Sequence, residues 1–408
     1  MTNTTNKRYE GGFFMKKRRN YVIFFLITIL ACSSIYAKPD ETTSNQTMAA
    51  TARSYVLMEQ SSGKVLLERD AEEAFPPASI TKVMTLLLIN EAIDAGKINW
   101  DDQVTISEHA AHMGGSQVFM EPGEVQTVRD LVKCISIASA NDAAVAMSEY
   151  IAGSEEQFVE LMNKRAKELG MDHTVFKNAC GLHVEGHVSC AKDIALMSRA
   201  LLEEHPEMSK ILTTWMDTIT HRTRRGESEF GLSNTNKMIK WYNGLTGLKT
   251  GYTPQAKHCV SATATRDQMG LIAVIMGAAD GKIRFQEAAQ LLDYGFANYK
   301  VKVGPQIGTI IAKQEIKKGT EKQIDVATAE TKSFVVPKAS ANSELTYELQ
   351  YNESLTAPIS KGDVVGRIIY YLDGNEVGEG TLVSASDVQK ATIKQMIPYM
   401  AKRFFKMA

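Results

Sequence analysis

The sequence predicts an α/β (α+β) fold in which a helical lobe is inserted between strands of one sheet. Three observations predict it. Alternating apolar and polar residues surround a Ser-Gly turn in "SYVLMEQSSGKVLLERD" (residues 54–70) and indicate a β-hairpin. Helical periodicity then dominates residues 79–202. Two apolar runs, "HCVSATATR" and "GLIAVIMGA", and an amphipathic segment close the unit, so the first and last strands come from opposite ends of the domain.

Within the lobe, the first helix follows "PPAS" and is almost wholly apolar from Val83 to Ile89, which predicts burial on all sides. The segment "TVRDLVKCISIASANDAAVAMSEYI" (residues 127–151) predicts two helices broken near residues 139–142. Further helices are expected at residues 155–169 and 191–202. The lobe therefore contains at least one chain break where side chains can project into a cleft.

Beyond these helices, "GLKTGYT" and the two apolar runs predict strands with a turn at residues 266–270, followed by a closing helix, "IRFQEAAQLLDYGFANY". After about Val301 the composition changes to short alternating runs rich in Lys, Glu, Thr and Val. This change predicts a small β-rich domain with a hairpin turn at Asp373-Gly374. We expect a catalytic domain at residues 53–299 and this β-rich domain at residues 300–384.

Composition limits the class of protein. The 408 residues carry a formal net charge of −1, and apolar and charged fractions are those of an ordinary globular chain. Nothing in the total charge indicates a nucleic-acid partner. No cofactor or metal is expected.

The N-terminus predicts export. A basic cluster, residues 16–19, precedes the apolar run Tyr21 to Ala31, as in a signal peptide covering residues 1–37 with cleavage after Ala37. A polar linker, residues 38–52, follows. Lipid attachment at Cys32 and an uncleaved signal anchor are the alternatives.

The C-terminal residues 385–408 predict a basic amphipathic helix. One face carries the apolar residues and the other the positive charges, with Asp387 opposing them; the apolar set is Ile393, Ile397, Met400, Ala401, Phe404 and Phe405. Such a helix is typical of a segment lying in a membrane surface. The alternative is a terminal helix docked on its own domain. The favoured location is the outer face of the cytoplasmic membrane, with peripheral attachment through this helix.

Four cysteines remain after the predicted cleavage site: Cys134, Cys180, Cys190 and Cys259. Export permits a short disulfide loop between Cys180 and Cys190. Free buried thiols are the alternative that we favour, because a protein of this size does not need disulfides for its stability.

Ser-x-x-Lys occurs three times, at Ser61, Ser79 and Ser189, where about one or two are expected by chance. Only Ser79 begins a helix that is predicted to be buried. Residues three apart on a helix are neighbours, so the Lys82 amine can reach the Ser79 hydroxyl and serve as its base if burial lowers its pKa. A serine cap with a solvated lysine is the structural alternative.

Two further motifs follow in order. Ser139-Ala140-Asn141 lies at the predicted helix break, and Lys249-Thr250-Gly251 lies on a predicted strand. Lys-Thr-Gly is expected by chance in roughly one chain in ten of this length. The second Ser-Ala-Asn, at residues 340–342, follows the Lys-Thr-Gly motif and falls in the β-rich domain, so we discard it. A helix cap is again the alternative for Ser139 or Asn141.

These three motifs resemble those of the penicillin-recognising serine enzymes. The phrases "PPASITKVMT", "SANDAAVAMSEYIAG", "GLTGLKTGYT" and "APISKGDVVGRIIYYLDG" are similar to the low-molecular-mass penicillin-binding proteins of the serine-type D-alanyl-D-alanine carboxypeptidase family, from about Ser54 to the C-terminus. The resemblance implies a β-lactamase/transpeptidase-like domain: an antiparallel sheet with helices on both faces and an inserted helical lobe. It also implies the small β-rich domain and the terminal amphipathic helix.

By this resemblance, Ser79 attacks the carbonyl of a terminal D-Ala-D-Ala peptide bond, with Lys82 as its base. Ser139 relays a proton to the leaving amine, and Asn141 binds the substrate backbone. The backbone N–H groups of Ser79 and Tyr252 form the oxyanion hole.

The resemblance also implies the carboxylate-binding residues. Lys249 and Thr250 recognise the terminal carboxylate, and the charge of Lys249 helps to depress the pKa of Lys82. Gly251 allows the strand to lie close to the substrate. Arg284 aids carboxylate binding, with a surface arginine as the alternative.

The implied function is removal of the terminal D-alanine from peptidoglycan stem peptides, with acylation by β-lactam antibiotics such as penicillin. A serine β-lactamase shares all three motifs, and a non-catalytic cell-wall or membrane scaffold is the alternative of a different class. The sequence departs from the family pattern at Ala140, where many relatives have Gly or Asp, and at Cys180 and Cys190, where small or hydroxyl residues are expected.

Overall fold

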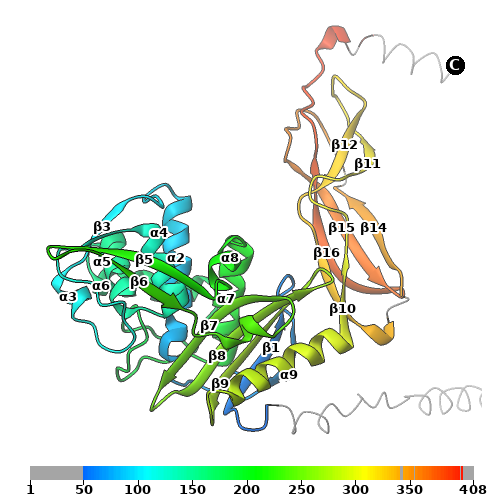
Figure 1. The fold of residues 1–408 in the computed structure, drawn as a ribbon. Coiled ribbons are helices and arrows are strands. Elements are labelled where there is room, and N and C mark those ends of the chain that lie inside the picture. Colours follow the sequence, from blue (N-terminus) through cyan, green and yellow to red (C-terminus); the bar gives the residue numbers. More distant parts are fainter. Residues whose placement is uncertain (1–48, 341–342, 353, 396, 398–408) are drawn as a thin grey trace, which may run out of the picture. The chain divides into compact units, whose positions relative to one another are not determined.

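The computed structural model of the chain describes residues 49–340, 343–352, 354–395 and 397 (Figure 1). The predicted signal peptide, Cys32 and most of the predicted linker lie outside the described residues. So do Met400, Phe404 and Phe405 of the predicted terminal helix.

A five-stranded antiparallel sheet forms the centre of the catalytic domain (Figure 1). Its strand order is β2-β1-β9-β8-β7. The bounds are β1 (Ser54–Glu59), β2 (Val65–Arg69), β7 (Leu245–Thr253), β8 (Lys257–Arg266) and β9 (Met269–Ala278). The N-terminal hairpin β1-β2 therefore pairs with β9, more than 200 residues later in the chain, which confirms the predicted sheet.

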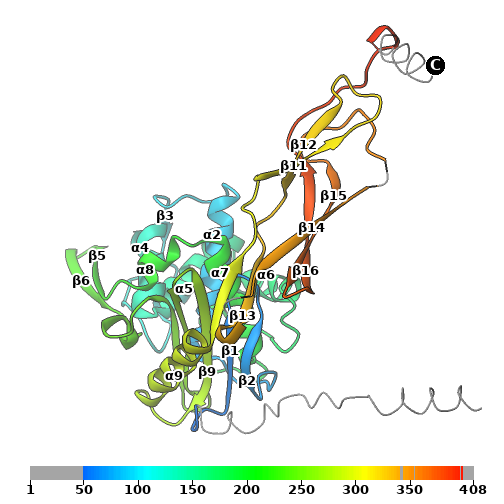
Figure 2. The ribbon, with the colours of Figure 1, turned by 90° about the vertical axis from the view of Figure 1, so that its right-hand side faces the viewer.

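Each face of the sheet has its own apolar core, because successive side chains of a strand point to opposite faces. On β1, Tyr55 and Leu57 pack into one core with α9 (Ile283–Asn298), which lies along that face (Figure 2). Val56 and Met58 pack into the other core with the helices of the lobe. The predicted arrangement of helices on both faces is confirmed.

The helical lobe lies between β2 and β7 in the sequence. Its helices are α2 (Lys82–Asp94), α3 (Glu108–Ala111), α4 (Val128–Lys133), α5 (Asn141–Ala152), α6 (Glu155–Glu168), α7 (Ala191–Glu204) and α8 (Met208–Leu212). Two short strands, β3 (Gln103–Thr105) and β4 (Val125–Thr127), pair within it. Ten of the 13 residues of α2 are buried, as its continuous apolar sequence predicts.

The predicted helix break is present. After α4 the chain forms one π-helical turn, η2 (Cys134–Ala138), and Ser139 then adopts a left-handed backbone with φ 61° before α5 begins. Irregular turns of this kind inside helices are frequent at functional sites.

A hairpin of β5 (Met216–Thr223) and β6 (Gly226–Ser233) was not predicted. Most of its side chains are polar and exposed, so its strand pattern is weak in the sequence. Ile219 and Leu232 attach it to the core of the lobe. A 3-10 turn, η3 (Lys237–Lys240), leads from it towards β7.

The β-rich domain contains a second five-stranded sheet, with the order β11-β12-β16-β15-β14. Its strands are β11 (Ile310–Glu315), β12 (Gln323–Thr328), β14 (Leu345–Tyr351), β15 (Val364–Leu372) and β16 (Asn375–Ser384). A separate ladder joins β10 (Tyr299–Val303) to β13 (Ser333–Pro337), which is followed by the short turn η4 (Lys338–Ser340). The predicted turn is present, with φ 51° at Asp373 and 77° at Gly374.

The chain after β16 remains attached to the β-rich domain as far as Ala391. The backbone N–H groups of Ala385, Val388 and Ala391 donate to the carbonyls of Asp325, Ile359 and Lys318. Residues 393–395 and 397 are helical, so the helix begins later than residue 385. Ile393 and Ile397 are exposed there. Within the described ranges, no helix has the length and apolar character needed to cross a membrane.

All four cysteines of the described chain are buried free thiols, so the favoured alternative for Cys180 and Cys190 is the one found. Cys190 caps α7, because its sulfur accepts the backbone N–H of Asp193. Burial raises the pKa of the Cys190 thiol to about 12, which keeps it protonated at neutral pH.

Candidate active site

Ser79 and Lys82 lie at the junction of a 3-10 turn and a buried helix. Ser79 belongs to η1 (Ala78–Thr81), and Lys82 is the first residue of α2. The Lys82 Nζ atom lies 3.2 Å from Ser79 Oγ. Lys82 is fully buried, whereas Ser79 is only half-buried and so remains partly accessible to solvent. Ala78 has a left-handed backbone, φ 49°, so the turn that presents the serine is strained.

Two other acceptors hold the Lys82 amine. Its nitrogen lies 2.6 Å from Asn141 Oδ1 and 2.7 Å from the carbonyl oxygen of Cys180. A neutral amine has two N–H donors and one lone pair, so these two contacts leave the lone pair for the Ser79 hydroxyl proton. Burial lowers the pKa of Lys82 to about 8, so an appreciable fraction of the neutral form exists near neutral pH.

The loop between α6 and α7 hydrogen-bonds to η1 and to the first turn of α2. Thr85 donates to the carbonyl of Ala179 at 2.6 Å. His187 Nε2 lies 2.9 Å from Thr81 Oγ1, and its Nδ1 accepts the N–H of Lys177 at 3.2 Å. Nδ1 is therefore unprotonated, and Nε2–H donates to the threonine. Burial lowers the pKa of His187 to about 4, so this neutral arrangement persists at neutral pH.

A second lysine, Lys249, contacts the Ser-Ala-Asn motif. Lys249 Nζ donates to Ser139 Oγ at 2.7 Å and to the carbonyl of Thr250 at 3.1 Å, and its side chain is 1% exposed. Burial, together with the charges of Lys82 and Arg284, holds the pKa of Lys249 well below its usual range. Among the described residues, no carboxylate forms an ion pair with Lys249. The site therefore contains a buried amine that has no anionic partner within the described part of the chain.

Asn141 connects the two halves of the site. It opens α5, and its Nδ2 donates to the carbonyl of Gly114 at 2.6 Å while its Oδ1 receives the Lys82 amine. Its backbone N–H donates to the carbonyl of Ser116 at 2.7 Å. The side chain is thus held in one orientation by the helix break and by residues 114–116.

Strand β7 forms the opposite wall of the site. Thr250 donates to Thr235 Oγ1 at 2.7 Å. A Cβ atom on Gly251 would lie 2.8 Å from the carbonyl oxygen of Pro77, so only glycine lets β7 pack this closely against η1. Gly181 is a comparable case on the other side of the turn, because a Cβ there would overlap the carbonyl oxygen of Ala78.

The last two predicted site residues, Tyr252 on β7 and Arg284 on α9, lie beside the end of the Lys-Thr-Gly strand. Tyr252 is exposed and stacks on His258, with ring centroids 4.5 Å apart. Arg284, in the first turn of α9, donates to the carbonyls of Gly251 and Cys259 at 2.9 and 3.2 Å. Arg284 is therefore bonded to the Lys-Thr-Gly strand, and its buried Nε has no hydrogen-bond partner among the residues that the structure describes.

The structure thus brings together the three predicted motifs. The contacts Ser79–Lys82–Asn141 and Ser139–Lys249 join them into one cluster. Sequence reasoning did not identify the Cys180 carbonyl or His187 as parts of the site. A backbone carbonyl leaves no side-chain signature, and a lone histidine in a loop is not distinctive.

Comparisons with known proteins agree with this geometry. The family model described as D-alanyl-D-alanine carboxypeptidase matches residues 40–280, and that of the penicillin-binding protein 5 C-terminal domain matches residues 305–390. D-alanyl-D-alanine carboxypeptidase DacF of Bacillus subtilis is 43% identical over 358 residues, covering 88% of this chain and 91% of the relative.

Two solved structures are similar. Penicillin-binding protein 5 from Haemophilus influenzae superposes with a TM-score of 0.71 at 31% identity, covering 83% of this chain and 98% of that chain. Penicillin-binding protein D2 from Listeria monocytogenes, in an ampicillin-bound form, has a TM-score of 0.51 at 32% identity, covering 60% of this chain and 97% of that chain.

The close packing of β7 on η1 can be tested with Gly251→Ala. The added methyl group meets the Pro77 carbonyl and the Ala78 side chain, so we expect a loss of about 1–3 kcal/mol in the free energy of unfolding. Gly231→Ala on β6 is the matched control, since a Cβ there meets nothing within 4 Å. Urea unfolding of both variants measures the difference, and equal stabilities would contradict the packing argument.

Proposed function

This chain belongs to the D-alanyl-D-alanine carboxypeptidase family, and from that premise we propose how its own residues remove the terminal D-alanine from peptidoglycan stem peptides. The observation that supports these roles best is the Lys82 amine. It is buried, has a lowered pKa, and is held by Asn141 and the Cys180 carbonyl with its lone pair available to Ser79.

In the proposed acylation step, Ser79 Oγ attacks the carbonyl carbon of the penultimate D-alanine while its proton passes to Lys82. The backbone N–H groups of Ser79 and Tyr252 stabilise the oxyanion. Ser139 relays this proton: it gives its own hydroxyl proton to the leaving amine and receives the one held by Lys82, while the C–N bond breaks and free D-alanine departs. Water then attacks the ester carbonyl, and one of its protons passes through Lys82 to Ser79 Oγ as the ester C–O bond breaks.

Substrate binding uses the buried Lys249 amine. Lys249 has no carboxylate partner within the described chain, so the terminal carboxylate of the substrate supplies one and favours its protonated form. On binding, the Thr250 hydroxyl turns its proton from Thr235 to the same carboxylate and accepts the hydroxyl proton of Thr235 instead. Arg284, whose guanidinium lies against Gly251, adds positive charge at this end. The amide nitrogen of Asn141 has a second N–H, which we assign to a carbonyl of the substrate backbone.

The same roles account for acylation by β-lactams. A β-lactam presents a strained amide and a carboxylate at a spacing similar to that of D-Ala-D-Ala, so Ser79 opens the ring and remains esterified. The rival functions are a serine β-lactamase, which would release this ester quickly, and a scaffold, which would never form it.

The nucleophile can be tested with Ser79→Ala. After penicillin is added, we expect the intact mass of the parent to rise by one penicillin and the variant to show no adduct. Ser61→Ala is the matched control, because Ser61 also precedes a lysine by three residues but lies in the first hairpin, bonded to Glu59. It is expected to be acylated like the parent.

Three outcomes would count against the proposal. An adduct on Ser79→Ala would place the nucleophile elsewhere. Fast penicillin turnover by the parent would indicate a β-lactamase. A parent protein that forms no adduct and releases no D-alanine from stem peptides would indicate the non-catalytic scaffold function.

The role of Lys82 as base predicts the pH dependence of acylation. Only the neutral amine accepts the serine proton, so the acylation rate should rise with pH through about 8 and level off above it. Lys82→Arg, which stays protonated, should lower the rate by about 10²-fold or more. Stopped-flow acylation by a fluorescent penicillin measures both. A rate that is flat or falls between about pH 6 and about pH 9, a range that includes the expected midpoint, would exclude Lys82 as the base.

We place the protein outside the cytoplasm, where its peptidoglycan substrate lies, and we infer peripheral membrane attachment through the C-terminal basic amphipathic helix. Two observations support attachment: Ile393 and Ile397 are exposed, and the positive charges Lys390, Lys394, Lys402, Arg403 and Lys406 surround them in sequence.

Backbone hydrogen bonds to the β-rich domain end at Ala391, so deletion of residues 392–408 should leave that domain intact. We expect the truncated protein to move from the membrane fraction to the soluble fraction with unchanged penicillin acylation. Cell fractionation measures the share of each protein in the membrane and soluble fractions, on protein from which the predicted signal peptide has been removed. Retention of the truncated protein in the membrane fraction would assign attachment to another segment.

A further inference from the structure

The loop that hydrogen-bonds to Asn141 also carries an exposed aromatic residue in a strained backbone conformation. Phe119 has φ 62° and its side chain is 67% exposed. Left-handed backbone is uncommon for residues other than glycine, asparagine and aspartate, and such strain persists only where the surroundings enforce it. An exposed phenyl ring gains little from burial, so ordinary packing does not explain why this position has a phenylalanine.

The backbone around Phe119 is fixed from the inside by Asp142. This carboxylate is fully buried and accepts the N–H groups of Val118, at 3.1 Å, and Met120, at 3.3 Å. These are the residues on either side of Phe119. Asp142 follows Asn141 directly, so one helix start orients both the amide of the site and the loop that carries the ring.

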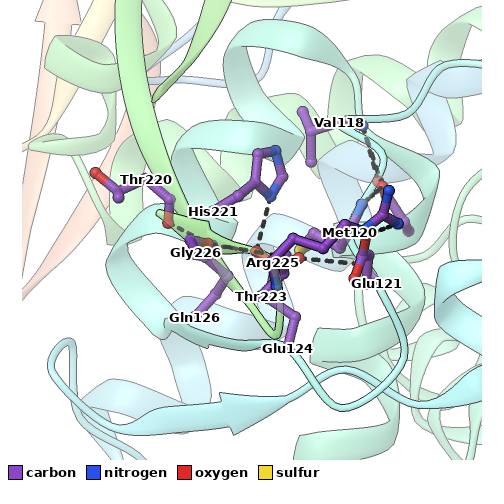
Figure 3. A network of polar contacts seen from close by, with 11 residues as sticks. Val118, Met120, Glu121, Glu124, Gln126, Thr220, His221, Thr223, Arg225 and Gly226 are labelled. Carbon is purple, nitrogen blue, oxygen red and sulfur yellow. Dashed lines mark hydrogen bonds and ion pairs between the residues drawn. The ribbon is translucent and has the colours of Figure 1, made fainter. Parts of the chain in front are cut away.

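The unpredicted hairpin fixes the same loop from the outside (Figure 3). Glu124 is buried and accepts from His221 Nδ1 at 2.7 Å, and it also accepts from Gln126 at 2.7 Å. Arg225 at the hairpin tip forms an ion pair with Glu121. The loop from Val118 to Gln126 is therefore held between α5 and the β5-β6 hairpin.

The hairpin also orients the ring itself. Phe230 meets Phe119 edge to face, with centroids 6.2 Å apart, and His221 meets Phe230 in the same manner at 5.4 Å. One edge of the Phe119 ring is thus supported, while most of its surface remains accessible.

The position of Phe119 relative to the substrate follows from the proposed function, on which this inference rests. With the terminal carboxylate at Lys249 and Thr250 and the scissile carbonyl at Ser79, the remainder of the stem peptide leaves the site past Asn141. The carbonyls of Gly114 and Ser116, in the loop that leads to Phe119, bond to Asn141 directly.

We propose that Phe119 is a specificity-determining residue that packs against the aliphatic part of the stem peptide on the amino side of D-Ala-D-Ala. Its ring is presented by the Asp142 and Glu124–His221 contacts and adds affinity for long peptides only. A substrate that ends at the dipeptide does not reach it.

The test compares two substrates: acetyl-capped D-Ala-D-Ala, and a pentapeptide with three further residues on its amino side. For Phe119→Ala and Phe119→Gly we expect kcat/KM on the pentapeptide to fall about tenfold through KM, with the dipeptide unaffected. Phe119→Gly relieves the left-handed strain, so its Tm should be no lower than that of the parent. Replacing a residue with a purely structural role would lower Tm along with activity. Phe119→Gly should instead lower kcat/KM on the pentapeptide while Tm stays the same or rises.

Gln268→Gly is the matched control. Gln268 is an exposed non-glycine residue with φ 65° in the β8-β9 turn, and its replacement should leave both substrates unaffected. Equal losses on the two substrates in the Phe119 variants would show that the ring acts only by positioning Asn141, and no loss would remove it from substrate binding. A parent that cleaves neither substrate would instead overturn the proposed function.

Discussion

The arrangement of the catalytic domain depends on the placement of one buried amine, that of Lys82. Taking an ammonium group out of water is costly, and the protein offsets this cost with an amide oxygen and a backbone carbonyl in place of a carboxylate. An adjacent carboxylate would have favoured the charged form. The neutral acceptors keep the amine in place and leave its basicity available.

This placement sets requirements for three other segments. Helix α2 must be buried on all sides. The α6-α7 loop must bring the Cys180 carbonyl to the Lys82 amine, and α5 must begin at Asn141. The last requirement explains the π-helical turn and the left-handed Ser139, since an uninterrupted helix through residues 134–141 would not let Ser139 reach Lys249 while Asn141 reaches Lys82. The sheet supplies β7 as the rigid opposite wall.

Much of this could be predicted from the sequence, because the signals are local. The buried helix, the helix break and the paired strands follow from the periodicity of apolar residues. The three motifs lie at the helix start, the break and the strand that this periodicity predicts. The catalytic and binding roles stay predictions for all nine site residues: Ser79, Lys82, Ser139, Asn141, Lys249, Thr250, Gly251, Tyr252 and Arg284.

The features that the sequence did not reveal depend on tertiary contacts. The carbonyl of Cys180 has no residue signature, Asp142 looks like an ordinary first-turn acid of a helix, and the β5-β6 hairpin is too polar for its strands to stand out.

The two glycines beside the nucleophile also limit how the site can change over evolutionary time. Gly181 and Gly251 bring backbone against the turn that holds Ser79 from two sides, where even a methyl group does not fit. Selection by antibiotics therefore has little freedom to reshape these walls without losing the serine's position. Heritable changes in drug sensitivity are expected instead in the loop before Asn141 and in the polar hairpin, where side chains can be exchanged without moving the nucleophile.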